Sequence, residues 1–154
     1  KFIVDSDEKG ATVTGSLPHV KKHNDHYIIK FGNNHIAKEH NDINSIDLED
    51  EYLKLKSSKK FKEVPNFNLS VFQISEDQIG IRTYENGAGE TLSCGSATIS
   101  VAYALLKDTN KNELLFTSRG GKTKVYKDGI SISSKADAVI LEQGYLNEWT
   151  KKKT

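Results

Sequence analysis

Apolar and polar residues alternate in many short runs of the chain, which is the pattern of strands with one buried face. The turn-forming segments 7–10, 75–78, 120–121 and 127–129 separate several of these runs. The alternation around His19 and His26 predicts two further strands joined by the turn 22–25. The sequence thus predicts a sheet of short strands. Those strands are expected at 2–4, 11–13, 27–31, 35–37, 69–74, 79–84, 113–117, 122–126, 130–133 and 138–142.

Two segments have helical character. Residues 44–56 mix apolar positions with acids and lysines, which predicts a short surface helix with Ser45 as its cap. Residues 95–107 are small or apolar almost all round and, before the closing Lys107, carry only hydroxyl groups as polar groups. A helix without a charged face is a buried one. The predicted fold class is therefore α+β, with antiparallel strands curled round one central buried helix.

Composition and charge exclude several classes of protein. The 154 residues allow one domain or two very small ones. The 22 basic and 21 acidic residues nearly cancel, which argues against a protein that grips nucleic acid phosphates. No apolar stretch is long enough for a membrane span. Arg82 and Arg119 are the only arginines, so guanidinium recognition of a carboxylate has at most two places to occur.

The sulfur-containing residues indicate compartment and completeness. A single cysteine allows no internal disulfide, so we expect a reducing compartment and a cytoplasmic protein. The sequence contains no methionine, not even at position 1. We therefore expect a piece of a longer protein, or a protein that lacks its start.

Metal-binding motifs are absent or incomplete. Residues 5–10 begin like a calcium loop, but Lys9 occupies a ligand position and Ser16 stands where the bidentate glutamate belongs. His19, His23 and His26 could share one face of a helix, but the alternation around them indicates strands and a turn. Solvated turn histidines are the favoured interpretation, and we expect no metal.

The segment 85–96 carries the clearest chemical signal. Glu85 ends a strand, a loop with two glycines follows, and Cys94 lies where the buried helix begins. The first N–H groups of that helix lack partners and carry partial positive charge. They are expected to lower the pKa of the thiol below ~8.5 and, approached closely at Gly95, to hold a substrate carboxylate. A glycine-rich connection with an inert buried cysteine explains the same residues equally well.

Residues 84–96, YENGAGETLSCGS, resemble the catalytic signature of the diaminopimelate epimerase family. These are cofactor-independent epimerases that act on an amino acid which is a precursor of lysine and of the cell wall. Three weaker matches follow the same order: GNNH at 32–35, NLSVFQ at 68–73, and the glycines at 120–121 and 144. The resemblance covers about 15–146. It implies one half of a two-domain, pseudo-symmetric fold with the active site in the cleft between the halves.

The same resemblance implies roles for particular residues. Cys94 corresponds to one of two catalytic cysteines, Glu85 to its acid–base partner, and His35 to the histidine that serves the other cysteine. No cofactor is implied. The residues implied in substrate binding are Asn33, Asn68, Asn86 and the backbone of Gly95 and Ser96.

The chain departs from the family pattern at several positions. Asn34 replaces a proline, Ala97 replaces a glycine, and Asn86 replaces the arginine that binds the far end of the substrate. The change at Asn86 puts the identity of the substrate in doubt. A second cysteine is missing altogether. We therefore expect a C-terminal domain at 16–146 that is inactive alone, preceded by the end of another domain or a leading hairpin at 1–15 and followed by a tail at 147–154.

Inverting a stereocentre by proton transfer needs a base on one face of the α-carbon and an acid on the other. The leading hypothesis is half of a diaminopimelate epimerase, whose partners are an amino-acid substrate and the missing N-terminal half. The alternatives are an amino-acid-binding module, a racemase for an amino acid without a distal carboxylate, and a cysteine hydrolase that uses Cys94 and His35. A homodimer is left open, and neither nucleic acid nor membrane is an expected partner.

Overall fold

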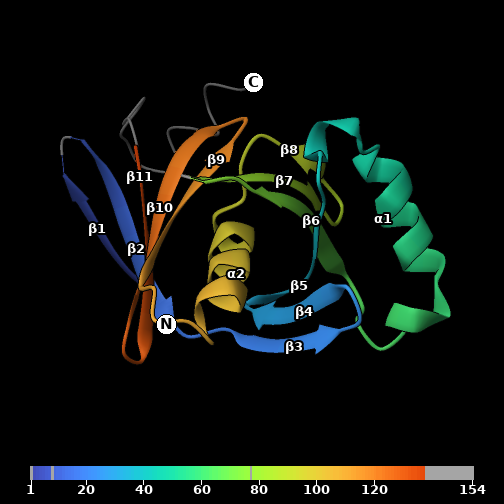
Figure 1. The fold of residues 1–154 in the computed structure, drawn as a ribbon, viewed down its shortest axis with the longest axis horizontal. Helices are drawn as coiled ribbons and strands as arrows, with labels where there is room; N and C mark the ends of the chain where they lie inside the picture. Colours follow the sequence, from blue (N-terminus) through green and yellow to red (C-terminus); the bar gives the residue numbers. More distant parts are fainter. Residues whose placement is uncertain (1, 8, 77, 138–154) are drawn as a thin grey trace, which may run out of the picture.

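Eleven strands form one curved sheet in the computed structural model, which describes residues 2–7, 9–76 and 78–137 (Figure 1). The strands follow each other in the order β1-β2-β11-β10-β9-β7-β6-β5-β4-β3, and β8 pairs with β7 off this path. Their bounds are β1 (Ile3–Asp7), β2 (Gly10–Ser16), β3 (His19–His23), β4 (His26–Phe31), β5 (Asn33–Glu39), β6 (Phe67–Ile74), β7 (Ile79–Glu85), β8 (Gly89–Thr91), β9 (Glu113–Ser118), β10 (Gly121–Asp128) and β11 (Ser131–Ala136).

The sheet is mixed, which corrects the prediction of antiparallel strands. Most neighbours are antiparallel, but β5 pairs with β6 in parallel and so does β7 with β9. Parallel neighbours need a crossover connection, usually with a helix in it. The first parallel pair is joined through α1 (Leu48–Ser57) and the second through β8 and α2 (Gly95–Leu106). The α+β class is confirmed.

The connection from β5 to β6 consists of three helical pieces. A 3-10 turn at Ile43–Ser45 precedes α1, and another at Lys59–Phe61 follows it. The side chain of Asp47 caps α1 by accepting the N–H of Asp50 at 3.0 Å. The predicted cap, Ser45, lies instead in the first 3-10 turn. Asp47 occupies the extended position one residue before the helix, where a carboxylate reaches the free N–H groups.

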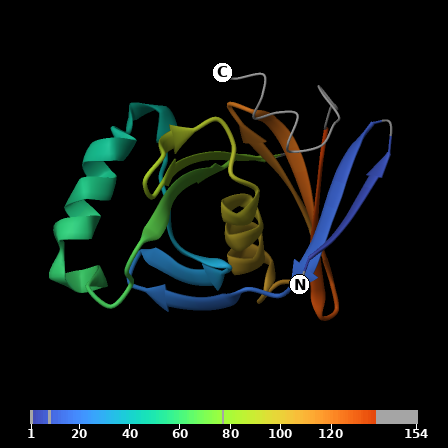
Figure 2. The same ribbon diagram turned by 180° about the vertical axis from the view of Figure 1, so that it is seen from behind.

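The two helices cover opposite faces of the sheet. α2 lies on the concave side and contacts β4, β5, β9, β10 and β11, whereas α1 lies on the other side (Figures 1 and 2). Every residue of β6 from Phe67 to Phe72 is buried, because this strand is covered on both faces. Phe72 belongs to the core around α2, and Leu69 and Val71 belong to the core under α1. β6 therefore separates two hydrophobic cores.

The N-terminal strands belong to the same sheet. β1 pairs antiparallel with β2, as the predicted hairpin requires, and β2 continues the sheet through β11. The predicted strand at 138–142, Gly144 and the predicted tail at 147–154 lie outside the described residues. Among the helices of the described residues, none is both long and apolar enough to cross a membrane.

Candidate functional site

Three neighbouring strands bring the predicted side chains together at one end of the sheet. His35 of β5 is in register with Asn68 of β6, and the pairing of Leu69 with Tyr84 brings Asn68 next to Glu85 at the end of β7. Side chains two residues apart on a strand share a face. His35, Asn68 and Glu85 therefore occupy the concave face of the sheet, the face that also carries α2.

Cys94 is the residue that precedes α2, and its side chain is buried. The Sγ atom lies 3.5 Å from the hydroxyl of Ser96. Burial raises the pKa of the Cys94 thiol, since it disfavours the thiolate. Hydrogen bonds from the Ser96 hydroxyl and the Ala97 N–H oppose this shift in pKa, and the neighbouring Glu85 carboxylate adds to it. The predicted lowering of the thiol pKa is therefore wrong, because burial and Glu85 outweigh the helix end.

The start of α2 leaves backbone donors open. The first intrahelical bond runs from the N–H of Thr98 to the carbonyl of Cys94 at 3.0 Å, so the N–H groups of Gly95 and Ser96 precede it. A Cβ atom added at Gly95 would meet no atom within 4 Å, so this residue faces open space. A cavity of about 260 Å³ lies beside Gly95 and Ser96, with Phe2 and Phe31 in its apolar wall. Cys94 and Glu85 are not in its lining, so this cavity marks open space beside the helix start and not the surroundings of the thiol.

The loop before Cys94 is held by the turn between β9 and β10. The N–H of Gly120 donates to the carbonyl of Leu92 at 2.7 Å. A Cβ atom at position 120 would lie 2.9 Å from the Cβ of Ser93 and 3.1 Å from the carbonyl oxygen of Leu92. This turn therefore needs glycine, and the close approach fixes the backbone that leads into Cys94.

Glu85 is positioned by a residue that the sequence did not single out. The hydroxyl of Thr91 donates to Oε1 of Glu85 at 2.7 Å. Thr91 ends β8, a strand that lies within the segment expected to be a loop. Gly87 and Gly89 turn the chain back with φ values of 86° and 85°, which glycine adopts without strain. In the sequence, the close spacing of these two glycines indicates a tight turn, and such a turn brings Thr91 back beside Glu85.

His35 is buried and uncharged at neutral pH. Its side chain is 1% exposed, and neither ring nitrogen has a hydrogen-bond partner among the described residues. Burial lowers its pKa to about 4, although the charge of Glu85 and the nearby backbone of Phe31 act in the opposite direction. Buried polar atoms without partners are rare in folded proteins, and each requires an explanation. Since both nitrogens are enclosed, the group that the structure offers to this ring is the backbone of Phe31.

The stability of the protein is expected to fall in mild acid because of His35. Its pKa is lower in the folded chain than in the unfolded chain, so between pH ~6.5 and pH ~4 only the unfolded state binds the proton. We expect the free energy of unfolding to fall over that range by up to about 3 kcal/mol. Urea unfolding of His35→Gln should show a smaller fall. The control His19→Gln alters an exposed ring. If the free energy of unfolding falls equally with pH in both variants, His35 is not the cause of the fall.

The three predicted asparagines differ in their surroundings. Asn68 is buried, and its Oδ1 accepts the N–H of Asn86 at 3.0 Å. The side chain of Asn86 turns to the other side of the sheet, where its Oδ1 accepts the hydroxyl of Tyr52 on α1 at 2.7 Å. Asn33 is exposed at the start of β5, on the same face as His35. Asn34, at the position of the family's proline, donates to the carbonyl of Pro65 at 2.8 Å.

The contribution of Glu85 to the thiol can be measured by alkylation of Cys94 against pH. We expect a midpoint above ~8.5 in the wild-type chain and a lower midpoint in Glu85→Gln, because the carboxylate raises the thiol pKa. The glutamine side chain still has an oxygen that can accept the hydroxyl of Thr91. Glu113→Gln removes an exposed carboxylate elsewhere and is the control. An unchanged midpoint in Glu85→Gln would contradict the proximity of the two groups.

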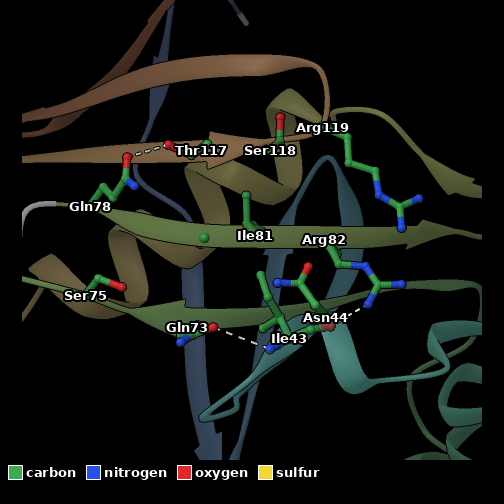
Figure 3. Close-up of a pocket in the computed structure, with 11 residues that line it drawn as sticks. Ile43, Asn44, Gln73, Ser75, Gln78, Ile81, Arg82, Thr117, Ser118 and Arg119 are labelled. Atoms are coloured by element: carbon green, nitrogen blue, oxygen red, sulfur yellow. Dashed lines mark hydrogen bonds between the residues drawn. The ribbon is translucent and has the colours of Figure 1, made fainter.

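Both arginines lie outside this site. Figure 3 shows them on the face of the sheet turned away from α2, beside a cavity of about 310 Å³. Arg82 binds Glu90 through two nitrogens at 2.8 and 2.9 Å and also donates to the carbonyls of Ile43 and Ile46. Arg119 lies 3.2 Å from the same carboxylate. Arg82 thus holds the segment before α1 against the sheet. Both guanidinium groups are paired with Glu90, so neither is free to take the place of the family's arginine at position 86.

Solved structures establish the fold by comparison. The chain is similar to a phenazine biosynthesis protein of the PhzF family from Bacillus anthracis, with a TM-score of 0.64 and 16% identity over 92% of this chain and 62% of that one. A PhzC/PhzF protein from Clostridium difficile gives a TM-score of 0.62 and 12% identity, covering 93% and 60%. At these identities the likeness establishes the shared fold alone.

Sequence comparison identifies the family. The diaminopimelate epimerase from Flavobacterium psychrophilum is 29% identical over 113 residues, which cover 71% of this chain and 44% of the relative. The one from Vesicomyosocius okutanii is 32% identical over 120 residues, which cover 75% and 43%. The chain thus spans less than half the length of these curated relatives. The family model for diaminopimelate epimerase matches residues 27–141, and the chain belongs to that family.

Proposed function

We propose that this chain is the C-terminal half of a cofactor-independent amino-acid epimerase and that Cys94 exchanges a proton with the α-carbon from one face. The observation that carries the proposal is the position of the thiol, buried at the start of α2 beside Glu85 and the N–H groups of Gly95 and Ser96. Diaminopimelate is the proposed substrate, and the lysine pathway and a reducing, cytoplasmic environment follow from it.

The raised thiol pKa is compatible with this chemistry. A neutral thiol is the form that gives a proton to a carbanion-like centre, and Glu85, whose carboxylate acts on the thiol pKa, is the proposed acceptor of the thiol proton when Cys94 acts as the base. The free N–H groups at the start of α2 would bind the substrate carboxylate beside the reacting carbon. They would also stabilise the negative charge that develops when the α-proton leaves.

The second half of the mechanism is proposed to come from another domain. One thiol serves one face of the α-carbon, and the part of the chain that the structure describes has one free cysteine. The curated relatives are more than twice as long as the matched segment. We propose a pseudo-symmetric pair of domains, of which residues 16–146 form the second. His35 would serve the cysteine of that first domain once its ring is uncovered, since both ring nitrogens are enclosed in the part of the chain that the structure describes.

The alternatives make different predictions about the α-proton. A binding module would hold an amino acid without exchanging that proton, whereas an epimerase exchanges it with solvent. A cysteine hydrolase would form a covalent acyl adduct on Cys94. His35 and Cys94 share no hydrogen bond among the described residues, and burial lowers the histidine pKa to about 4. The arrangement therefore does not favour the thiolate–imidazolium pair that such a hydrolase uses.

The proposal is tested by supplying the N-terminal half of a curated relative and following the substrate in heavy water. Deuterium at the α-carbon together with inverted product supports the epimerase. Tight binding without deuterium supports the binding module. A mass increase on Cys94 equal to an acyl group supports the hydrolase, and either of these last two results would refute the proposed reaction.

Asn86 is expected to change which substrate is accepted more than it changes the chemistry. A neutral amide lacks the charge-assisted, bidentate contact of an arginine. Asn86→Arg removes the oxygen that accepts the hydroxyl of Tyr52, so the new side chain is no longer held toward α1 and can turn to the cleft. In the joined protein it should then tighten binding of diaminopimelate by about 2–3 kcal/mol and leave amino acids without a distal carboxylate unaffected. Titration of both ligands checks this, with Asn112→Arg as the control at an exposed site. Unchanged affinities would mean that residue 86 stays turned toward Tyr52.

A further inference from the structure

A cavity of about 420 Å³ lies on the side of the sheet opposite to α2. It is bounded by the last turn of α1, the 3-10 turn at Lys59–Phe61 and the start of β6. Tyr52, Phe61 and Phe67 line it, and each of these side chains is 3% exposed. The rings of Tyr52 and Phe67 lie 5.3 Å apart between centroids. The floor of the cavity is therefore aromatic and fixed by the core under α1.

The rim of the same cavity is positively charged. Lys56, Lys59 and Lys62 line it, and its lining contains no acidic residue. Within the described residues no carboxylate lies within ion-pair distance of these three lysines. Two neighbouring lysines of the same segment are paired instead, Lys54 with Asp50 at 2.5 Å and Lys60 with Asp25 at 3.6 Å. The unpaired cations thus gather at the cavity.

The position of Lys56 joins the charged rim to the aromatic floor. Its Nζ lies 3.4 Å from the hydroxyl oxygen of Tyr52 and 5.4 Å from the centroid of that ring. An ammonium group over an aromatic face is favourably oriented by the ring quadrupole. An anion that binds Lys56 would therefore lie beside Tyr52, with its charge on the ammonium group and not on the electron-rich ring face. Lys59 and Lys62 line the same cavity from the 3-10 turn and the residue after it.

We propose that this cavity is a binding site for an organic anion, with a carboxylate or phosphate group held by the three lysines and an apolar body on the aromatic floor. Three like charges at one concave rim attract an anion and are stabilised by it. The cavity beside the two arginines differs in this respect, because both of its guanidinium groups are already paired with Glu90. The site is separate from Cys94 and independent of the proposed epimerase reaction.

The hydroxyl of Tyr52 also connects this cavity to the candidate active site. It donates to Asn86, whose N–H donates to Asn68. A ligand that moves Lys56 or Tyr52 therefore displaces the hydroxyl that donates to Asn86, the first residue of the loop after β7. We expect the amide signal of Asn86 to shift when the cavity is filled, although the ligand does not touch it.

The chain as it stands can be tested by NMR titration with benzoate, phenyl phosphate, neutral benzamide and inorganic phosphate. We expect saturable shifts of the amides in 56–67 with benzoate or phenyl phosphate, and none with benzamide. The two anions distinguish a carboxylate ligand from a phosphate ligand. Lys59→Gln or Lys62→Gln should weaken binding about two- to fivefold each, and the triple variant with Lys56→Gln by roughly tenfold or more.

Lys54→Gln is the matched control, because Lys54 lies on the same helix outside the cavity and is paired with Asp50. Equal loss of affinity in Lys54→Gln and in the rim variants would overturn the proposal, because it would indicate a general charge effect. Binding of inorganic phosphate as tight as that of phenyl phosphate would remove the role of the aromatic floor. Absence of saturable shifts with both organic anions would refute the site.

Discussion

Replacing Cys94 by alanine, in a protein in which the N-terminal half is restored, is expected to lower epimerisation by about 10²–10⁴-fold. The loss follows because the thiol is the proposed proton donor and acceptor on one face of the α-carbon. The start of α2 and its N–H groups remain, so substrate binding should change much less than turnover. Steady-state rates and ligand titration measure the two effects separately.

Two further variants distinguish loss of the thiol from a structural disturbance at the buried N-terminus of α2. Cys94→Ser keeps the shape of the side chain but not the acidity of the thiol, and it should lose as much activity as alanine. Ser93→Ala changes the exposed neighbour and should leave the rate within about twofold of the wild type. Full activity in Cys94→Ser would contradict the role of the thiol.

The chain on its own is expected not to exchange the α-proton of diaminopimelate at an enzymatic rate. One thiol serves one face, and the opposite wall of the cleft is proposed to belong to the other half. Incubation in heavy water followed by mass spectrometry of the substrate measures this. The oligomeric state must be determined in the same sample, because a homodimer could bring two Cys94 thiols to one cleft. Turnover by the monomer would contradict the two-base proposal.

Both helices and the strands other than β8 could be predicted from the sequence because each follows from a local pattern. The alternation at 69–74 and 79–84 gave β6 and β7, and the segment at 95–107, uncharged up to Lys107, gave α2. The parallel pairing of β5 with β6 was not predictable from alternation, which is the same in both directions. It follows from the connection through α1, where the chain crosses to the other face before it returns.

The candidate site could be predicted only in outline. Cys94 and Glu85 stand close together in the sequence, and a helix start beside a glycine-rich loop is a recognisable pattern. The sign of the thiol pKa shift depends on burial, which no local pattern reports. Contacts between distant segments were equally invisible, such as the hydroxyl of Tyr52 on Asn86, 34 residues away. Thr91 was missed because β8 is too short to show alternation.

The central claim is that Cys94 moves a proton on one face of the α-carbon while another thiol serves the other face. The most direct test compares the two isomers at that carbon in heavy water with the joined Cys94→Ala protein. We predict that inversion from either isomer is slowed by about 10²–10⁴-fold. The isomer whose proton faces the remaining thiol should still exchange it with retention, and the isomer whose proton faces position 94 should not. Equal loss of exchange from both isomers, or inversion at an undiminished rate, would contradict the assignment of Cys94.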